Sequence, residues 1–522
     1  MTQDESALLE PGNAYQSRYR DEFQKNVAAY LDRLVTDSHM DVAANQKAAE
    51  AYRTQTALAA ALEKKVRRVR VGKGLLLSLG IVCLLLCAPV AYQGSWAIAV
   101  PLGVLGVVAL VLTFTAMRRA LQKRQTALEA ARQAAKEAYR QAMETIAPFL
   151  DLLDNGVTKR LVQMTVPTLV LDPNFNMKRY DYLSGKYGYP EQDGAVTSTV
   201  GILSGEIVGN PFVFERKLQQ TWAKLTYTGS LEIKWTEYHR DGNGKMVAEH
   251  HSETLHASIT RSAPDYHYRN CLVYGNDAAP DLVFSRTKTH VEAMSEKKQK
   301  SFVKSRTKKI YKQQKTQMAS GFTALGNAEF DALFGAFDRN NEPQFRLLFT
   351  PLAQKNLLSL MRETSPYGDD FDFRKDRCIN VLESDHLQKW NLNIDTEQYS
   401  SYDLALCKKA FMELNSAYFQ SLYFDFAPLL SIPLYQQMKP KEYIYQIAYP
   451  RNYTVREAEV LANRIGDQGL VSANAATPAI FKTKFESKKG KADYVQIAAH
   501  AFKGVPRVEY VSVYGGTAVG KR

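Results

Sequence analysis

Residues 74–92 read GLLLSLGIVCLLLCAPVAY and residues 97–117 read AIAVPLGVLGVVALVLTFTAM, and neither stretch contains a charged side chain. Each is close to the ~20 residues that an α-helix needs to cross a hydrocarbon layer about 30 Å thick. The connection between them is too short to hold a domain, so the two helices must turn back on each other. The sequence therefore predicts a transmembrane hairpin over residues 74–117. The alternative, a buried helical pair in a soluble protein, is disfavoured because a soluble core rarely holds such runs with basic flanks.

Basic residues flank both predicted spans, whereas the turn between the spans has none. The positive-inside rule then predicts a protein with two spans in the cell (inner or plasma) membrane and both termini in the cytoplasm. The basic side chains should also contact anionic lipid headgroups, which is worth about 1 kcal/mol for each residue near the surface. The predicted membrane-surface residues are Lys64, Lys65, Arg67, Arg68, Arg70, Lys73, Arg118, Arg119, Lys123 and Arg124.

The two spans are typical of an anchor rather than of a transport path. Neither contains an ionisable residue, whereas proton paths, ion channels and transporters usually need polar groups at membrane depth. Residues 1–60 are polar and lack the basic start and short apolar core of a signal peptide, so we expect none there.

The composition indicates a folded protein with an anionic partner. The 522 residues are enough for two or three domains. The net charge of +13 favours a membrane surface, a nucleic acid or an acidic protein as that partner. The five cysteines form neither a CxxC pair nor a dense framework, so we expect free thiols in a reducing compartment.

The hydrophobic period changes along the chain and divides it into segments. Residues 118–147 repeat leucine and alanine every three, four or seven positions, which predicts one face of a helix that continues the second span. An antiparallel helical stalk with alanines at its seam is favoured, and self-association as a coiled coil is the alternative. The predicted fold class is α+β with antiparallel strands. Its predicted segments are a cytoplasmic helical segment (1–73), the transmembrane hairpin (74–117), the stalk (118–150), a β-rich subdomain (151–285), a basic helix or linker (286–320) and an α+β subdomain (321–522).

Alternation of apolar and polar residues predicts antiparallel strands after the stalk. Residues 231–238 and 245–259 flank a glycine-rich turn at 241–244, which indicates a β-hairpin. Residues 329–337 and 344–350 are predicted as two strands ahead of a helix at 351–361. The remaining predicted elements are strands at 196–208, 270–274 and 378–382, helices at 405–424 and 455–465, and a closing hairpin at 494–501 and 507–514.

Residues 286–318 form a strongly basic run with few apolar positions, which predicts a solvated helix or helix–loop. Contact with anionic lipid is the second interpretation, and contact with nucleic acid or an acidic protein is the third. Nucleic acid is disfavoured because only Phe302 and Tyr311 interleave the basic residues as stacking groups. The candidate contacts for an anionic partner are Lys297, Lys298, Lys300, Lys304, Arg306, Lys308 and Lys309.

Three other patterns have features of functional sites, and none predicts a reaction. The C-terminal GGTAVGKR has phosphate-loop spacing, but it lacks the hydroxyl residue and the following helix that such a loop needs. His250 and His256 would share a strand face, yet they lie roughly 20 Å apart, too far to bind one metal ion. The acidic residues Asp369, Asp370 and Asp372 are interpreted as a polar loop, with acid–base work or divalent-ion binding as the alternative.

Residues 327–334 (NAEFDALF) and 345–352 (FRLLFTPL) resemble a segment of an uncharacterised bacterial membrane-protein family. In that family two N-terminal spans precede a cytoplasmic α+β domain of unknown function. The resemblance implies a bacterial source and no known activity, and it supplies no catalytic residues.

The sequence predicts a membrane-anchored cytoplasmic binding or assembly module whose protein partner is unknown, and self-association is an open alternative. A rival is a membrane-tethered enzyme whose site assembles from distant residues, since no catalytic motif is present. No cofactor and no metal are expected.

Overall fold

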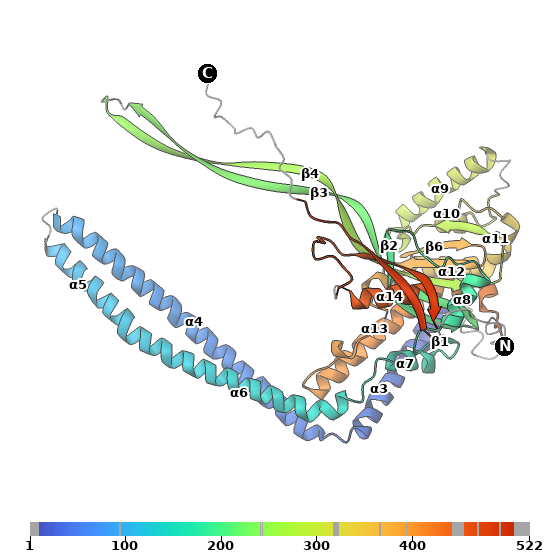
Figure 1. The fold of residues 1–522 in the computed structure, drawn as a ribbon, viewed down its shortest axis with the longest axis horizontal. Helices are drawn as coiled ribbons and strands as arrows, with labels where there is room; N and C mark the ends of the chain where they lie inside the picture. The colour runs from blue at the N-terminus through green and yellow to red at the C-terminus, as the bar shows by residue number, and fades with distance from the viewer. Residues whose placement is uncertain are drawn as a thin grey trace. The chain divides into compact units, whose positions relative to one another are not determined.

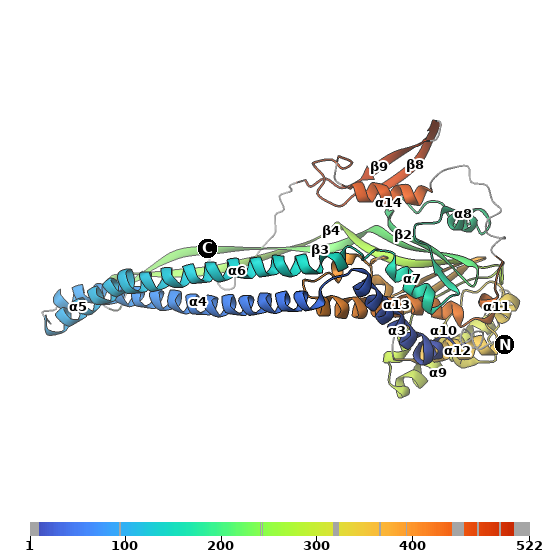
Figure 2. The same ribbon diagram turned by 90° about the horizontal axis from the view of Figure 1, so that it is seen from below.

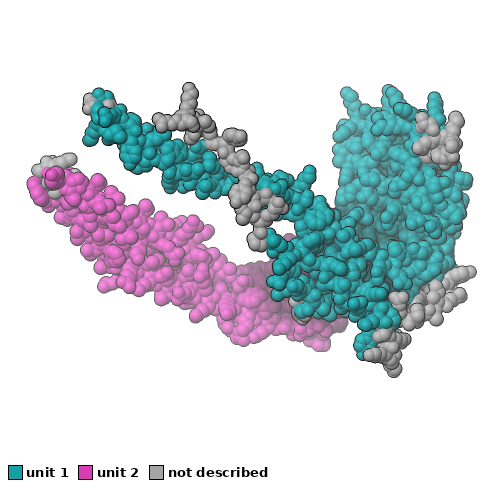
Figure 3. Space-filling view, turned by 45° about the horizontal axis from the view of Figure 1, so that its top comes forward, with its two compact units in different colours: residues 1–21, 162–393, 418–522 teal, residues 22–161, 394–417 magenta. Residues whose placement is uncertain are grey.

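The computed structural model describes residues 10–92, 96–240, 242, 244–316, 323–364, 367–392, 394–440, 454–466, 469–489 and 492–505. The chain is a mixed α+β protein with an antiparallel sheet, as predicted. It divides into two compact units, which Figure 3 colours separately. Unit 1 comprises residues 1–21, 162–393 and 418–522, and unit 2 comprises residues 22–161 and 394–417.

Unit 2 is helical and contains the predicted stalk. In both views α4 runs alongside α5 and then α6 (Figure 1, Figure 2). Alanines are buried at the seam between these helices, as the spacing predicts, because small side chains let two helix backbones approach closely. Ala131, Ala138 and Ala142 are among them. Its main elements are α3 (Arg20–Asp37), α4 (Val42–Tyr92), α5 (Trp96–Leu112), η2 (Thr113–Met117), α6 (Arg118–Leu150), η6 (Thr396–Gln398) and the first half of α13 (Leu404–Leu430).

Asn45 ties three helices of unit 2 together from a buried position. Its amide Nδ2 donates to the carbonyl of Ala142 at 3.2 Å and to the hydroxyl of Thr145 at 3.0 Å. Its Oδ1 accepts from the backbone N–H of Leu404 at 3.0 Å, at the start of α13. A buried polar group with every contact made is stabilising and directional, so Asn45 sets the register of α4 against α6.

Within the described part of the chain, two helices are long and apolar enough to cross a membrane. Only 11% of the most apolar window of the first and 22% of that of the second are buried, unlike the core helix of a soluble protein. The helices approach closely at Gly80 and Gly106, where a Cβ on Gly106 would lie 3.1 Å from the carbonyl oxygen of Gly80. Gly74, by contrast, would have nothing within 4 Å of an added Cβ.

Unit 1 is built on a seven-stranded antiparallel sheet in the order β1-β2-β3-β4-β7-β6-β5. Val208 and Gly209 both have positive φ, 50° and 72°, which makes the two-residue connection of β2 to β3 a tight turn matched to strand twist. The strands are β1 (Leu169–Leu171), β2 (Thr197–Ile207), β3 (Asn210–Arg240), β4 (Met246–Gly275), β5 (Val283–Arg286), β6 (Phe371–Asp376) and β7 (Ile379–Ser384).

Helices cover both faces of the sheet near this turn. Phe212 and Phe214 share one face of β3, and Phe426 of α13 packs on them with ring centroids at 4.7 and 5.6 Å. Val213 points to the other face, where it joins a buried cluster with Tyr180 of α8. The helices of unit 1 are α2 (Pro11–Ala14), η1 (Tyr15–Tyr19), the end of α7 (Val157–Thr165), α8 (Met177–Gly185), η3 (Val291–Ala293), α9 (Glu296–Thr316), α10 (Ala328–Phe334), α11 (Glu342–Leu348), α12 (Pro351–Arg362), η5 (Leu387–Lys389), the second half of α13, η7 (Pro433–Gln436) and α14 (Val455–Ile465).

The two strands predicted at 329–337 and 344–350 are wrong, because these residues form α10 and α11. Asn327 caps α10 by accepting from the N–H of Phe330, and Asn341 caps α11 by accepting from that of Gln344. Gly335 ends α10 with φ of 73°, a conformation that glycine adopts without strain. These capping residues are visible in the sequence and outweigh the strand preference of the phenylalanines between them.

The closing hairpin differs from the predicted one. Strand β9 (Ala492–His500) pairs with β8 (Ile480–Lys489), which precedes it in the chain. Residues 507–514, its predicted partner, lie outside the described residues.

Candidate functional site

The predicted membrane-surface residues gather at one level of the unit 2 hairpin. Gly72 of α4 lies opposite Met117, whose Cε would be 3.3 Å from a Cβ on that glycine. The basic stretches before the first span and after the second are therefore side by side, and all ten side chains are exposed except Lys73, which is half-buried. A surface groove of about 450 Å³ is lined there by Lys64, Arg67, Arg68, Val71, Gly72 and Leu75.

The basic run forms α9, as predicted, and most of its lysines are exposed. Arg306 differs from the other candidate contacts. Its guanidinium lies over the rings of Phe302 and Phe337 at 4.8 and 5.5 Å, and burial lowers its pKa. Arg306 therefore packs α9 against α10 and the residues that follow it. The other candidates face solvent: Lys297, Lys298, Lys300, Lys304, Lys308 and Lys309.

Asp369 and Asp370 lie in a loop, as the sequence favoured, but this loop is buried, and Asp372 lies within β6. Asp369 is fully buried, where it pairs with Arg286 and accepts from the N–H of Thr289 at 2.9 Å. Asp370 is also buried and lies 2.6 Å from Nδ1 of His386. Only Asp372 of the three keeps partial exposure. The cationic partners come from β5 and from the segment after β7, so spacing within the acidic stretch could not reveal them.

His386 joins two buried carboxylates that are distant in sequence. Its Nδ1 faces Asp370, and its Nε2 lies 3.1 Å from Oδ1 of Asp425 on α13. Burial alone would lower the pKa of His386, but the two carboxylates outweigh it and raise the value to about 10. Burial raises the pKa of Asp425. The ring of Tyr367 stacks on the imidazole at 4.0 Å, so these side chains form an enclosed acid–base cluster.

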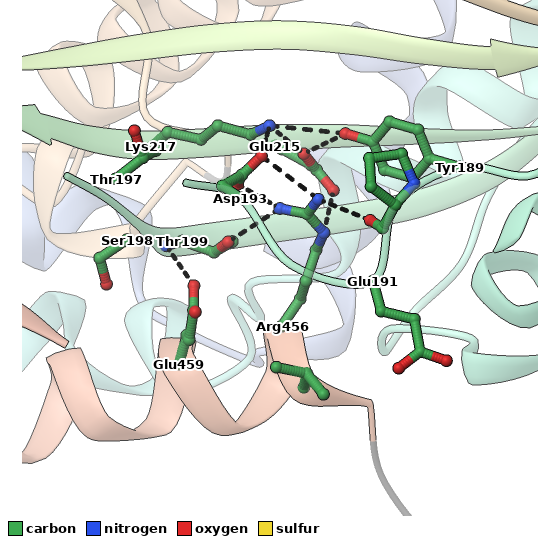
Figure 4. Close-up of polar contacts among 12 residues, drawn as sticks. Tyr189, Glu191, Asp193, Thr197, Ser198, Thr199, Glu215, Lys217, Arg456 and Glu459 are labelled. Atoms are coloured by element: carbon green, nitrogen blue, oxygen red, sulfur yellow. Dashed lines mark hydrogen bonds and ion pairs between the residues drawn. The ribbon is translucent and has the colours of Figure 1, made fainter. Parts of the chain in front are cut away.

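A second buried ionic network holds α14 to the sheet, and Figure 4 shows its members. Arg456 lies 3.0 Å from Glu215 of β3, pairs with Asp193 and donates to Tyr180 Oη at 2.6 Å. Lys217 lies 2.8 Å from Glu215 on its other side.

One turn further along α14, Glu459 accepts from the N–H of Thr199 at 2.9 Å and pairs with Lys482 of β8 at 2.7 Å. Burial would lower the pKa of Arg456, but Glu215 and its neighbours raise it well above its usual range. The network therefore stays ionised and clamps α14 and β8 onto β2 and β3.

Strands β3 and β4 extend far beyond the rest of their sheet. Strand β2 pairs with β3 only as far as Gln219, and β7 pairs with β4 only from Leu272 onward. Residues 221–240 and 246–265 therefore pair only with each other among the described strands, and we call this two-stranded ribbon the arm. At ~3.3 Å per residue it is about 65 Å long, and Figure 1 shows it leaving the sheet. The hairpin predicted around residues 231–259 is its outer part.

The two faces of the arm differ in polarity. Directly opposed residues share a face, and one face carries threonine, serine, lysine, glutamate and histidine from Lys224 to Thr236 and across from them. Thr226 and Thr260 form a hydroxyl hydrogen bond of 2.9 Å on this polar face. The opposite face is mainly apolar and is formed by Ala223, Leu225, Tyr227, Gly229, Leu231, Ile233 and Trp235 paired with Ala263, Arg261, Ile259, Ala257, Leu255, Glu253 and His251.

The apolar face of the arm is exposed along most of β3 and half-buried along most of β4. Leu231 is 64% exposed and Tyr227 54% exposed. An isolated two-stranded hairpin is only marginally stable in water, and a continuous apolar face on a monomer usually marks an interaction site. The sequence shows the alternation, but it could not show that no described element covers the face.

The histidines considered for a metal site lie on the arm. His250 and His256 do share the polar face, and Nδ1 of His250 lies 2.8 Å from the hydroxyl of Thr236. Among the described residues, no group of three or more histidine, cysteine, aspartate or glutamate side chains is arranged to hold a metal ion. The C-terminal GGTAVGKR lies outside the described residues.

No protein-family model, no curated protein and no solved structure matches this chain. Function must therefore be inferred from the chain's own geometry.

Proposed function

We propose that this protein is a membrane-anchored cytoplasmic binding and assembly module whose arm is the binding element. The exposed apolar face of the arm carries the proposal. Burying it against a partner would remove aromatic and aliphatic surface from water at about 25 cal/mol for each Å². The outer edges of both strands pair with no other described strand beyond Gln219 and before Leu272, so they add backbone donors and acceptors that a partner could use.

The anchor in this proposal is the helical hairpin of unit 2. Its apolar surface is mostly exposed, its two spans contain no charged residue, and basic side chains surround its base. The groove beside Arg67 and Arg68 combines cations with apolar side chains, which suits an anionic lipid headgroup. The same basic flanks favour a cytoplasmic location for both termini.

The rival, a membrane-tethered enzyme, would draw its acid–base chemistry from the cluster at His386. That imidazole is 4% exposed and Asp425 is 2% exposed, and both lie in contact with other buried side chains. Such enclosure supports a role in holding α13 to the sheet more than contact with a substrate.

Shortening the arm tests the proposal. Replacing residues 224–262 with Asn-Gly would join the opposed residues Ala223 and Ala263 by a two-residue turn of the kind that hairpins favour. The variant keeps the packing of Trp222 on Phe502 at the base of the arm, so the sheet should fold normally. We expect loss of the proteins that cross-link to the wild type in membranes. An unchanged set of cross-linked proteins, from a variant with wild-type thermal stability, would refute the binding role.

Reporter fusions test the topology separately. Reporters at the two termini should both behave as cytoplasmic, because the turn between the spans has no lysine or arginine. An external signal from either terminus would contradict the orientation.

A further inference from the structure

Helix α9 has two sides of different character. Its inner side carries Val303 and Ile310, which pack in an apolar cluster with Ala332 of α10. Arg306 lies on the same side, where it donates to the carbonyl of Ala332 at 3.3 Å and lies over the ring of Phe337. The aliphatic residues of α9 are therefore already packed within the fold.

The outer side of α9 is a row of lysines. Lys297, Lys304, Lys308 and Lys315 are all exposed, and the last three lie 7, 11 and 18 positions after the first. At 3.6 residues per turn these separations are close to two, three and five whole turns, so the four side chains leave the helix along one line about 27 Å long. Three further exposed lysines stand beside this line: Lys298, Lys300 and Lys309.

No acidic side chain neutralises this row. Glu296 is the only acidic residue of α9, and it lies at the first position of the helix. None of the seven lysines forms an ion pair with a residue that the structure describes. Lysines four positions apart on a helix repel each other, as Lys304 does with Lys300 and with Lys308. An anionic surface would remove this repulsion, so the row favours binding to one.

We propose that the lysine row of α9 is a binding surface for anionic lipid headgroups, which gives unit 1 a membrane contact of its own. The proposal goes beyond the binding function above, because it concerns neither the arm nor the helical hairpin. A lysine close to an anionic bilayer acts through its charge rather than through a fixed geometry, and each one strengthens binding roughly fivefold. A row along one side of a helix can meet a flat surface over its whole length.

Two features favour lipid over nucleic acid. Arg306, the one arginine of α9, faces inward, so the outer side has no guanidinium fork of the kind that clamps phosphates or reads bases. Tyr311 is the only exposed aromatic residue of α9, whereas proteins that bind single strands stack successive bases on several aromatic rings. An acidic protein is disfavoured because the row lacks the aromatic and arginine anchors that carry most protein interfaces.

The same geometry excludes insertion of α9 into the bilayer. Because Val303 and Ile310 face α10, the helix has no apolar side to bury among acyl chains, as interfacial amphipathic helices do. Binding should therefore be electrostatic and should fall steeply with salt, since the Debye length shrinks from about 10 Å at 0.1 M to about 3 Å at 1 M.

Vesicle binding by full-length protein held in nanodiscs of phosphatidylcholine tests the proposal. The nanodisc occupies the two predicted spans, so co-flotation with added vesicles reports on the other surfaces of the protein. We expect binding to phosphatidylcholine vesicles that contain about 30% phosphatidylserine, in about 0.1 M salt, and no binding to vesicles of phosphatidylcholine alone.

Substitution of the central line locates the surface. Lys297→Gln, Lys304→Gln, Lys308→Gln and Lys315→Gln together should lower this binding at least about a hundredfold. Glutamine has a helix propensity close to that of lysine, so circular dichroism and thermal unfolding should match the wild type. Arginine at the same four positions should retain binding, because the charge is kept.

A matched control removes the same charge elsewhere in unit 1. It replaces four other exposed lysines with glutamine and should bind like the wild type: Lys224, Lys234, Lys355 and Lys389. Equal binding by the α9 glutamine variant and the wild type would overturn the proposal, as would an equal loss in the control or a loss in the arginine variant. Tighter binding of a single-stranded oligonucleotide than of the anionic vesicles at the same salt would overturn it in favour of nucleic acid.

Discussion

Replacing Arg456 with methionine should weaken the attachment of α14 to the sheet. The guanidinium is 1% exposed and contacts two carboxylates, the hydroxyl of Tyr180 and the carbonyl of Pro190. Methionine fills most of the volume but leaves Glu215, which is fully buried, with less positive charge around it. Breaking a buried ion pair from one side typically costs about 3–5 kcal/mol.

The expected cost lies near the lower end of that range. Lys217 remains 2.8 Å from Glu215 and continues to neutralise it. A loss of about 3 kcal/mol corresponds to roughly a 150-fold rise in the open population of α14. Hydrogen exchange of the α14 amides, measured alongside denaturant unfolding in detergent, should report this change.

A matched control lies on the same helix. Arg464 is exposed near the end of α14, so Arg464→Met should change stability by less than about 0.5 kcal/mol. Adding Glu215→Gln to Arg456→Met should recover part of the lost stability, because glutamine has no buried charge that needs an opposite charge beside it. A loss below about 1 kcal/mol for Arg456→Met, or one equal to that of the control, would refute the role of the network.

Three further perturbations test other parts of the fold. The pKa of His386 in the folded state, about 10, lies above its unfolded value of 6.5. Its contribution to the free energy of unfolding is therefore complete below pH 6.5 and is lost as the pH rises through 10. His386→Gln should make the thermal unfolding temperature depend less on pH over that window. An unchanged pH dependence would contradict the raised pKa of His386. Asn45→Ala leaves the buried N–H of Leu404 without its acceptor and should cost about 1–3 kcal/mol, with faster exchange of that amide as the check. Gly106→Leu should lower the unfolding temperature in detergent by forcing the spans apart, at about 1–3 kcal/mol, whereas Gly74→Ala, with open space around it, should not.

Local patterns predicted many of the elements well. The helix predicted at 455–465 has those bounds, and the predicted strand at 196–208 became β2 (Thr197–Ile207). The failure at α10 and α11 has a local cause too, since Asn327, Asn341 and Gly335 are capping signals that the phenylalanine-rich pattern obscured. Strand β8 was missed because alternation of lysine with phenylalanine and threonine is a weak signal until β9 pairs with it.

The sequence by itself determined two features, because both depend on neighbouring residues alone. Uncharged runs of span length predict apolar helices, and period-two alternation predicts a ribbon with one polar and one apolar face. Only the tertiary structure decided where charges are buried. His386 meets Asp370 and Asp425, and Glu215 meets Arg456, through contacts between segments far apart in the chain. The structure alone also showed that β2 stops pairing with β3 at Gln219 while β3 and β4 continue together as the arm. Strand pairing is a long-range property that composition does not encode.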